Sequence, residues 1–383
     1  MISFQTLLNA FKHVGAGGNV NPLTLARNVL PAYLSPSGYA FTPLTVFISI
    51  NSVCNMKCKM CDVGQRNESS AFYKNLKPDD TLPQLSKERL FELVREVSCF
   101  HPKPRISVTT TEPFLHKDLF AFAQAVSLAG MEFQVTTNGS LLHLHLDEIF
   151  QSGVRELCVS IDAKGERHDQ IRGMPGLYAK IKESLREIAG RKRQHGLAVP
   201  RITIAVTISN FNYANLLELM DDLDESLYDR AIISHMNFID DAMVEEHNRD
   251  YAFVGKAEKA GLPGETDNYK VDVPVLWEQI RAIKSRHSKV HFAPDYNLKH
   301  LNRFYNEPDR FVWPNRCYIP WFVLEVLANG DVIPMTRCIH IIMGNIYKKT
   351  LSEIWNDQPY RRFRQYLIRY KRFSVCRRCR GLL

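Results

Sequence analysis

Long hydrophobic runs are missing from this sequence. Nowhere in its 383 residues do about 18 to 20 apolar residues follow one another, which is the length that a membrane-spanning helix needs. Near the N-terminus, Lys12 interrupts a modest apolar stretch, so no secretory signal is predicted. With 45% hydrophobic residues, the chain is long enough for a substantial core, and we expect it in the cytoplasm.

The spacing of a disulfide framework is also absent. The nine cysteines are clustered, with Cys54, Cys58 and Cys61 in one group and Cys376 and Cys379 near the other end. Clustered thiols favour metal binding in a reducing compartment. Acidic residues are missing from 359–383, where there are nine Arg or Lys, so this end should attract anions.

Alternating patterns predict an α/β fold. Short apolar, β-branched runs predict strands at 44–50, 105–110, 133–137, 157–161, 202–208 and 231–236. Amphipathic patterns predict helices at 88–97, 119–128, 178–189, 213–223 and 275–285. This alternation predicts a parallel sheet, either open or part of a β/α barrel.

Several polar residues and one thiol follow these strands directly. They are Cys54, Thr111, Asn138 and Asp162. Because ligands gather at the carboxyl ends of parallel strands, one mouth could collect all four, and this favours the barrel.

The pattern along the chain also predicts boundaries. Residues 1–43 read as a lead-in and 44–307 as the barrel, within which the polar stretch 239–272 is expected to cap the mouth. The strand and helix rhythm stops after about residue 308, and 308–383 contain four of the nine cysteines, so we expect a second domain there.

Three closely spaced thiolates suit one kind of metal group. They can hold three irons of a cubane cluster and leave the fourth iron open to a ligand, whereas structural zinc needs a fourth side chain that is not found nearby. The run CNMKCKMC at 54–61 resembles the signature of the radical S-adenosylmethionine (SAM) superfamily. The resemblance implies a partial (β/α)6 barrel and a 4Fe-4S cluster on Cys54, Cys58 and Cys61, where SAM is cleaved to a 5'-deoxyadenosyl radical.

The resemblance also implies the residues that contact SAM. Thr110-Thr111-Glu112-Pro113 stands where the family has Gly-Gly-Glu-Pro, so Thr111 and Glu112 are expected to receive the SAM ammonium. Asn138 belongs to a Thr-Asn-Gly turn that the family shares. Ser160 and Asp162 are expected toward the SAM ribose and carboxylate, with Arg172 as the carboxylate partner.

Three other residues are interpreted without a family role. Cys99 and Cys158 are predicted to be core residues, because unpaired cysteines are commonly buried. His235 could face the substrate or lie in the core, and the sequence leaves both open.

The C-terminal cysteines resemble a SPASM or twitch extension. Cys317, Cys338, Cys376 and Cys379 make four thiols, enough for one auxiliary 4Fe-4S cluster, although four thiolates would also suit zinc. Full ligation leaves no open iron, which favours electron transfer. The basic end then has three candidate partners: an acidic electron donor such as flavodoxin or ferredoxin, an anionic substrate, and nucleic acid, which we do not expect because no nucleic-acid motif accompanies it.

The resemblance leads to one main hypothesis and two alternatives. We expect an oxidoreductase or radical-rearrangement enzyme that acts on a small polar molecule of the sugar or cyclitol kind, because few residues precede the barrel for a peptide-leader module. The first alternative is an enzyme that modifies ribosomal peptides. The second, of a different class, is a zinc-stapled RNA-binding protein.

Overall fold

One sheet organises the molecule. The computed structural model describes residues 23, 27–28, 30–77, 82–261, 269–312, 316–334 and 339–379. Its ten strands have the order β10-β9-β8-β1-β2-β3-β4-β5-β6-β7. The strands are β1 Thr45–Ile48, β2 Arg105–Val108, β3 Phe133–Thr137, β4 Val154–Ser160, β5 Arg201–Ile208, β6 Arg230–His235, β7 Val290–Ala293, β8 Val323–Val326, β9 Asp331–Ile333 and β10 Gly344–Asn345.

Strands β1 to β7 pair in chain order and are all parallel. Strand β8 joins the free edge of β1, again in parallel, and β9 and β10 follow as antiparallel strands. The predicted fold class, a partial β/α barrel with a C-terminal extension, is confirmed. The six predicted strands are β1 to β6, and one further parallel strand, β7, was not predicted, because it is four residues long, contains the polar His291 and ends at a proline.

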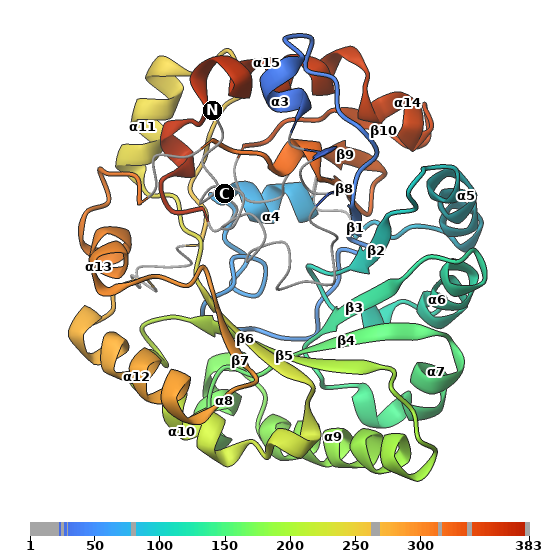
Figure 1. Cartoon of the computed structure of the whole chain (residues 1–383), viewed down its shortest axis with the longest axis vertical. Coiled ribbons are helices and arrows are strands. Elements are labelled where there is room, and N and C mark those ends of the chain that lie inside the picture. The colour runs from blue at the N-terminus through green and yellow to red at the C-terminus, as the bar shows by residue number, and fades with distance from the viewer. Residues whose placement is uncertain are drawn as a thin grey trace.

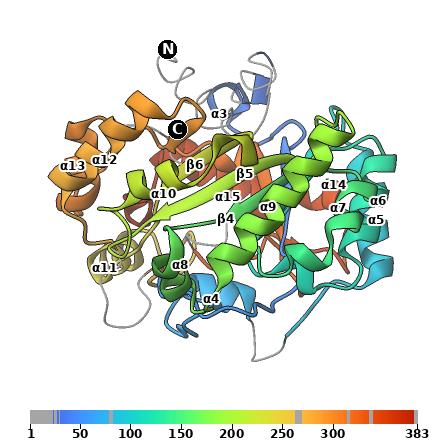
Figure 2. The same ribbon diagram turned by 90° about the horizontal axis from the view of Figure 1, so that it is seen from below.

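Most of the helices surround the curved sheet as an outer ring, whereas α4 lies in the middle of the view (Figure 1). The helices are α3 Pro31–Leu34, α4 Ala71–Leu76, α5 Lys87–Ser98, α6 Leu119–Leu128, α7 Leu146–Gln151, α8 Gly165–Arg172, α9 Leu177–Gln194, α10 Leu216–Asp222, α11 Asp241–Asp250, α12 Val273–Arg286, α13 Leu298–Asn306, α14 Leu351–Trp355 and α15 Gln358–Tyr370. Figure 2 shows α9 across the outer face of β4 and β5. No helix in these described ranges is long and apolar enough to cross a membrane.

Burial along the strands explains the layering. In β3, Phe133 and Val135 are fully buried, while Gln134 and Thr136, which alternate with them, are half-buried. Successive side chains of a strand point to opposite faces, so the apolar row packs under the helices and the polar row faces the barrel interior. The interior is therefore available for a polar site.

The predicted lead-in and the predicted cap both pack against the C-terminal part of the chain. Of the predicted lead-in, residues 30–43 are described almost continuously, and Gly38 lies so close to Arg361 that an added Cβ would be 2.2 Å from its carbonyl oxygen. In the predicted cap, α11 contacts the C-terminal cysteine region, since Glu246 accepts hydrogen bonds from Ser374 and Arg377. Residues 262–268 of that cap lie outside the described residues, so a capping role stays a prediction.

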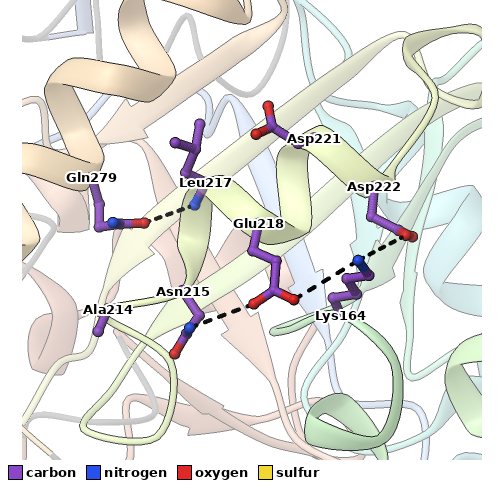
Figure 3. A pocket seen from close by; sticks show the side chains of 8 residues that line it. All are labelled: Lys164, Ala214, Asn215, Leu217, Glu218, Asp221, Asp222 and Gln279. Carbon is purple, nitrogen blue, oxygen red and sulfur yellow. Dashed lines mark hydrogen bonds and ion pairs between the residues drawn. The ribbon is translucent and has the colours of Figure 1, made fainter.

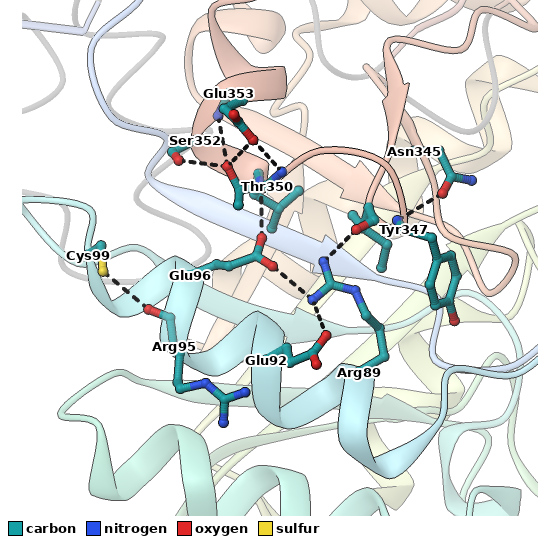
Figure 4. A network of polar contacts seen from close by, with 12 residues as sticks. Arg89, Glu92, Arg95, Glu96, Cys99, Asn345, Tyr347, Thr350, Ser352 and Glu353 are labelled. Carbon is teal, nitrogen blue, oxygen red and sulfur yellow. Dashed lines mark hydrogen bonds and ion pairs between the residues drawn. The ribbon is translucent and has the colours of Figure 1, made fainter.

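A buried arginine joins the barrel to the C-terminal segment, which we define as the described residues from 316 onward (Figure 4). Arg89 on α5 is 5% exposed, and its Nη2 donates to the carbonyl of Ile346 at 2.8 Å. Its Nη1 pairs with Glu96 at 2.8 Å, and Glu96 accepts a further bond from the amide of Leu351. The joint therefore depends on a buried ion pair as well as on apolar contacts.

Replacing this arginine tests the joint. Arg89→Ala removes the cation of Glu96 and a donor to Ile346, and should lower the free energy of unfolding by about 2 to 3 kcal/mol. Urea unfolding followed by circular dichroism measures the change. Glu92→Ala is the control, because the Glu92 side chain is 50% exposed, and it should change stability by less than about 0.5 kcal/mol. Equal stability of both variants would contradict the assignment.

Candidate active site

Three thiols border one cavity at the mouth of the barrel. Cys54, Cys58 and Cys61 follow β1 in a loop, and all three line a cavity of about 370 Å³. In the part of the chain that the structure describes, no group of three or more His, Cys, Asp or Glu side chains could hold a single metal ion. The three thiols do line the same cavity, and three thiolates are the ligand set for three irons of a cubane cluster.

The loop that carries these thiols is held by its own polar groups. Gly64 lies so close that an added Cβ would be 2.9 Å from the amide nitrogen of Cys58. The Gln65 side-chain amide donates to the carbonyls of Lys57 and Cys58, at 3.0 and 3.1 Å. These contacts fix the backbone between the first two thiols.

A carboxylate that the sequence analysis did not single out anchors the other end of the loop. Asp62 is 1% exposed and accepts hydrogen bonds from Asn67 at 3.0 Å and from Ser70 at 2.7 Å. It also accepts from the amide of Gly261 at 2.6 Å, which connects the loop to the predicted cap. The only sequence signal was an acidic residue directly after Cys61.

Burial changes the acidity of the thiols. It raises the pKa of Cys58 to about 12, while the nearby Arg172 guanidinium acts in the opposite direction. Burial also raises the pKa of Cys54, and the neighbouring Cys61 adds to the effect. Without metal these thiols keep their protons, and a bound metal replaces those protons. Three thiols on one cavity, of which Cys58 is buried and Cys54 and Cys61 are half-buried, therefore fit an iron-sulfur cluster.

Strained backbone marks the end of β2. Thr110 has φ of +97°, a region that β-branched residues rarely adopt and glycine adopts freely. Its hydroxyl bonds to that of Ser49 at 2.5 Å, and Thr111 next to it donates to both oxygens of Asn51 at 2.8 Å. Thr110 thus keeps a glycine-like backbone where the resemblance expects glycine.

Glu112 is enclosed and does not line the cavity. Its carboxylate accepts from the Phe114 amide at 3.1 Å, the Thr137 hydroxyl at 2.8 Å and the Asn138 amide at 2.7 Å. Burial raises its pKa to about 7, although these donors favour the charged form. The side chain therefore joins the end of β2 to the turn after β3, and Asn138 in that turn lines the cavity.

Asp162 also acts through a neighbour. It is fully buried, accepts from Arg172 Nε at 2.6 Å and from the Thr207 amide at 2.9 Å, and is not part of the cavity wall. Arg172 does line the cavity, with Nη1 3.9 Å from Cys58 Sγ. Asp162 therefore sets the position of a cation beside the thiols.

The predicted SAM-contacting residues thus fall into two groups. Thr111, Asn138, Ser160 and Arg172 line the cavity with the thiols, whereas Glu112 and Asp162 support residues that line it.

The structure also tests the predictions for Cys99, Cys158 and His235. Cys158 is buried as predicted, but Cys99 is exposed at the end of α5, so its prediction as a core residue was wrong. His235 is fully buried, shares a hydrogen bond of 2.9 Å with Tyr305 and is not part of the cavity wall, which favours the core reading.

Other cavity residues were missed by the sequence reasoning. Glu325 on β8 is 7% exposed, lines the cavity, and accepts from the Ser49 hydroxyl at 3.5 Å. Phe47, Thr207 and Asn237 line the same cavity. A single carboxylate inside the apolar run 322–327 was the available signal for Glu325.

The C-terminal thiols border a second cavity. Cys317, Cys376 and Cys379 line it, and Pro334 belongs to the walls of both cavities. Burial and the neighbouring thiols raise the pKa of Cys317, and burial raises the pKa of Cys376 to about 12. Cys338, the fourth predicted ligand, lies outside the described residues. The three described thiols fit a second cluster by the same argument.

A third hollow, at α10 and α12, has a different character (Figure 3). It contains no cysteine, and its carboxylates include Glu218 and Asp222, which pair with Lys164 at 3.8 and 3.5 Å. We do not assign it to the active site.

Comparison with known families agrees with this geometry. A family model described as the radical SAM superfamily matches residues 48–223, and one named SPASM, an iron-sulfur cluster-binding domain, matches residues 317–380. The chain belongs to the radical SAM superfamily. It is a radical SAM enzyme with a C-terminal SPASM domain, and these domains imply a 4Fe-4S cluster, auxiliary iron-sulfur binding and SAM. The hypothesis of a zinc-stapled RNA-binding protein was therefore wrong.

The chain is similar to proteins that are named for several different activities. It is 23% identical over 86% of its length to the Fe-coproporphyrin III synthase of Methanosarcina barkeri and covers 77% of that protein. It is 30% identical over 54% of its length to a GTP 3',8-cyclase of Rhizobium etli, of which it also covers only 54%. The crystal structure of Streptococcus suis SuiB bound to the precursor peptide SuiA has a TM-score of 0.59 at 16% identity, over 90% of this chain and 72% of that one, which shows a shared fold.

The strained backbone of Thr110 gives a test of the turn after β2. Thr110→Gly relieves the strain of a φ of +97° but loses the hydroxyl bond to Ser49, so its free energy of unfolding should stay within about 1 kcal/mol of wild type. Thr111→Gly, the control, loses both bonds to Asn51 and should lower stability by about 1 to 2 kcal/mol. Urea unfolding of the two variants measures both changes. A Thr110→Gly protein that is less stable than Thr111→Gly would show that Thr110 is not strained.

Proposed function

We propose that this chain abstracts a hydrogen atom from a small polar, hydroxyl-bearing molecule, of the sugar or cyclitol kind, and oxidises or rearranges it. Cys54, Cys58 and Cys61 would hold the SAM-binding 4Fe-4S cluster. Cys317, Cys376 and Cys379, with Cys338, would hold one auxiliary 4Fe-4S cluster. In the radical SAM family, SAM and the reduced cluster together supply a 5'-deoxyadenosyl radical.

The side chains of this chain would orient SAM in the cavity. Arg172 offers a planar fork to the SAM carboxylate and is itself fixed by Asp162, so little ordering is needed on binding. The Thr111 backbone, with Glu112 behind it, would receive the ammonium. Asn138 and Ser160 line the cavity from the next two strands and would face the remaining polar groups of SAM.

The proposal of a polar substrate is based on the residues that line the cavity. Seven of the nineteen residues that line it carry hydroxyl groups, namely Thr109, Thr110, Thr111, Thr136, Thr137, Ser160 and Thr207. Glu325 adds a carboxylate that is held against the hydroxyl of Ser49. Polar groups in a cavity wall favour ligands that can exchange hydrogen bonds with them. This wall suits a molecule with several hydroxyl or amino groups.

A peptide substrate is the second candidate. It is favoured by the shared fold with SuiB, which has been crystallised with a precursor peptide. The relatives named as porphyrin and nucleotide enzymes support a small molecule instead.

Release of 5'-deoxyadenosine from SAM tests the radical chemistry. Anaerobic wild-type protein with dithionite should release it, and the Cys54→Ala, Cys58→Ala, Cys61→Ala triple variant should lose at least about 99% of the rate, because no cluster is held. Cys99→Ala is the control, since Cys99 is exposed and lies outside both thiol cavities. Release that survives in the triple variant would refute the assignment of the cluster.

The substrate class needs a separate test. Polar small-molecule extract should stimulate the release of 5'-deoxyadenosine more than a peptide extract does. Glu325→Gln should reduce that stimulation by about tenfold or more, because a charged acceptor is lost from the wall, while its iron content and its dissociation constant for SAM stay within about twofold of wild type. Stimulation by the peptide extract alone would favour the second candidate.

A further inference from the structure

A further groove lies beside α15, near the C-terminal thiols, and its composition resembles that of a protein interface. This groove beside α15 has a volume of about 300 Å³, and its lining includes Phe253, Ile341, Phe363, Tyr366 and Arg362. Phe253 is 51% exposed, although its ring lies 5.2 Å from that of Tyr366. Aromatic residues and arginine at a half-exposed apolar surface are the composition of protein interfaces.

Aromatic side chains connect this groove to the thiols. Phe363 lines the groove and also the cavity of Cys317, Cys376 and Cys379. A second series of rings runs beside it, with Phe253 6.3 Å from Tyr251, and Tyr251 5.4 Å from a second wall residue of the thiol cavity, Phe373. A partner seated in the groove would therefore be one side chain away from the cavity that the thiols border.

The exposed residues beside the groove carry positive charge, which favours an acidic partner. Arg362 and Arg369 are both exposed and lie two helical turns apart on the same side of α15, a helix without any acidic residue. Asp250, at the end of α11 just before Tyr251 and Phe253, is already paired with Arg249 at 2.8 Å. The groove thus offers an apolar floor with a positive border, which complements an acidic protein whose redox group is exposed.

We propose that an acidic one-electron carrier protein of the flavodoxin type docks in this groove, with its reduced flavin facing Phe363. One electron then moves from the flavin to the iron-sulfur group that the C-terminal thiols hold, and no covalent bond forms or breaks. The proposal rests on the assignment of the auxiliary cluster and does not depend on the substrate class.

Binding of a bacterial flavodoxin to the reconstituted enzyme tests the docking site. The Arg362→Glu, Arg369→Glu double variant should raise the dissociation constant by about tenfold or more at about 50 mM salt, and less at about 300 mM, because screening weakens charge attraction. Phe253→Ala should weaken binding at both salt concentrations, since it removes apolar contact area. Lys180→Glu, Arg186→Glu on α9 is the matched control and should change the constant by less than about twofold.

Reduction kinetics give a second readout, from the iron-sulfur absorbance. The double variant should be reduced about tenfold more slowly by reduced flavodoxin and at the wild-type rate by dithionite, which needs no docking surface. Equal binding by the double variant and the control would overturn the proposal. So would a wild-type dimer that the double variant loses, since a second copy would then occupy the groove. Failure of the 5'-deoxyadenosine test leaves the dissociation constants unaffected, so the two assignments fail separately.

Discussion

The parallel pairing of β1 with β8 is the constraint on which the site depends. It places Glu325 beside Phe47, and on the other side of β1 the same Phe47 pairs with Ser107. Parallel strands cannot be joined by a tight turn. Here all the strands from β2 to β7 lie between β1 and β8 in the sequence, so the chain comes back to the edge of β1 only after it has passed through the barrel. Because the two strands are parallel, the return places Cys317, which precedes β8, toward the opposite end of the strands from the thiols that follow β1. Both cysteine groups are thereby held on one sheet, with Pro334 in the walls of both cavities.

Buried carboxylates give the mouth its rigidity. Asp62, Glu112 and Asp162 are each nearly or fully inaccessible, and each accepts bonds from backbone amides and side chains of two or more segments. A charged acceptor with several donors forms strong hydrogen bonds, so each carboxylate joins loops that adjacent strands alone would leave independent. Positioning of this kind keeps Arg172 and Asn138 in place before a ligand binds.

The two cavities that the cysteines line have different walls. Toward the barrel, the lining includes several hydroxyl groups and the carboxylate of Glu325. Toward the C-terminal thiols, the lining is apolar and aromatic. Polar groups next to a ligand confer selectivity, whereas an apolar wall keeps water from buried thiols. Under the proposed function, this division would separate the binding of a substrate from the transfer of electrons.

The sequence by itself determined the local parts of this protein. The helix predicted at 119–128 and the strand predicted at 133–137 coincide with α6 and β3, because each carries a complete periodic pattern. The spacing of Cys54, Cys58 and Cys61 was enough to indicate the family, since closely spaced ligands need no distant partner. Tertiary structure alone decided which side chains face the cavity. Glu112 and Asp162 turn toward neighbouring strands, and Glu325 enters from β8, because side-chain direction depends on strand register and on hydrogen-bond donors far away in the chain.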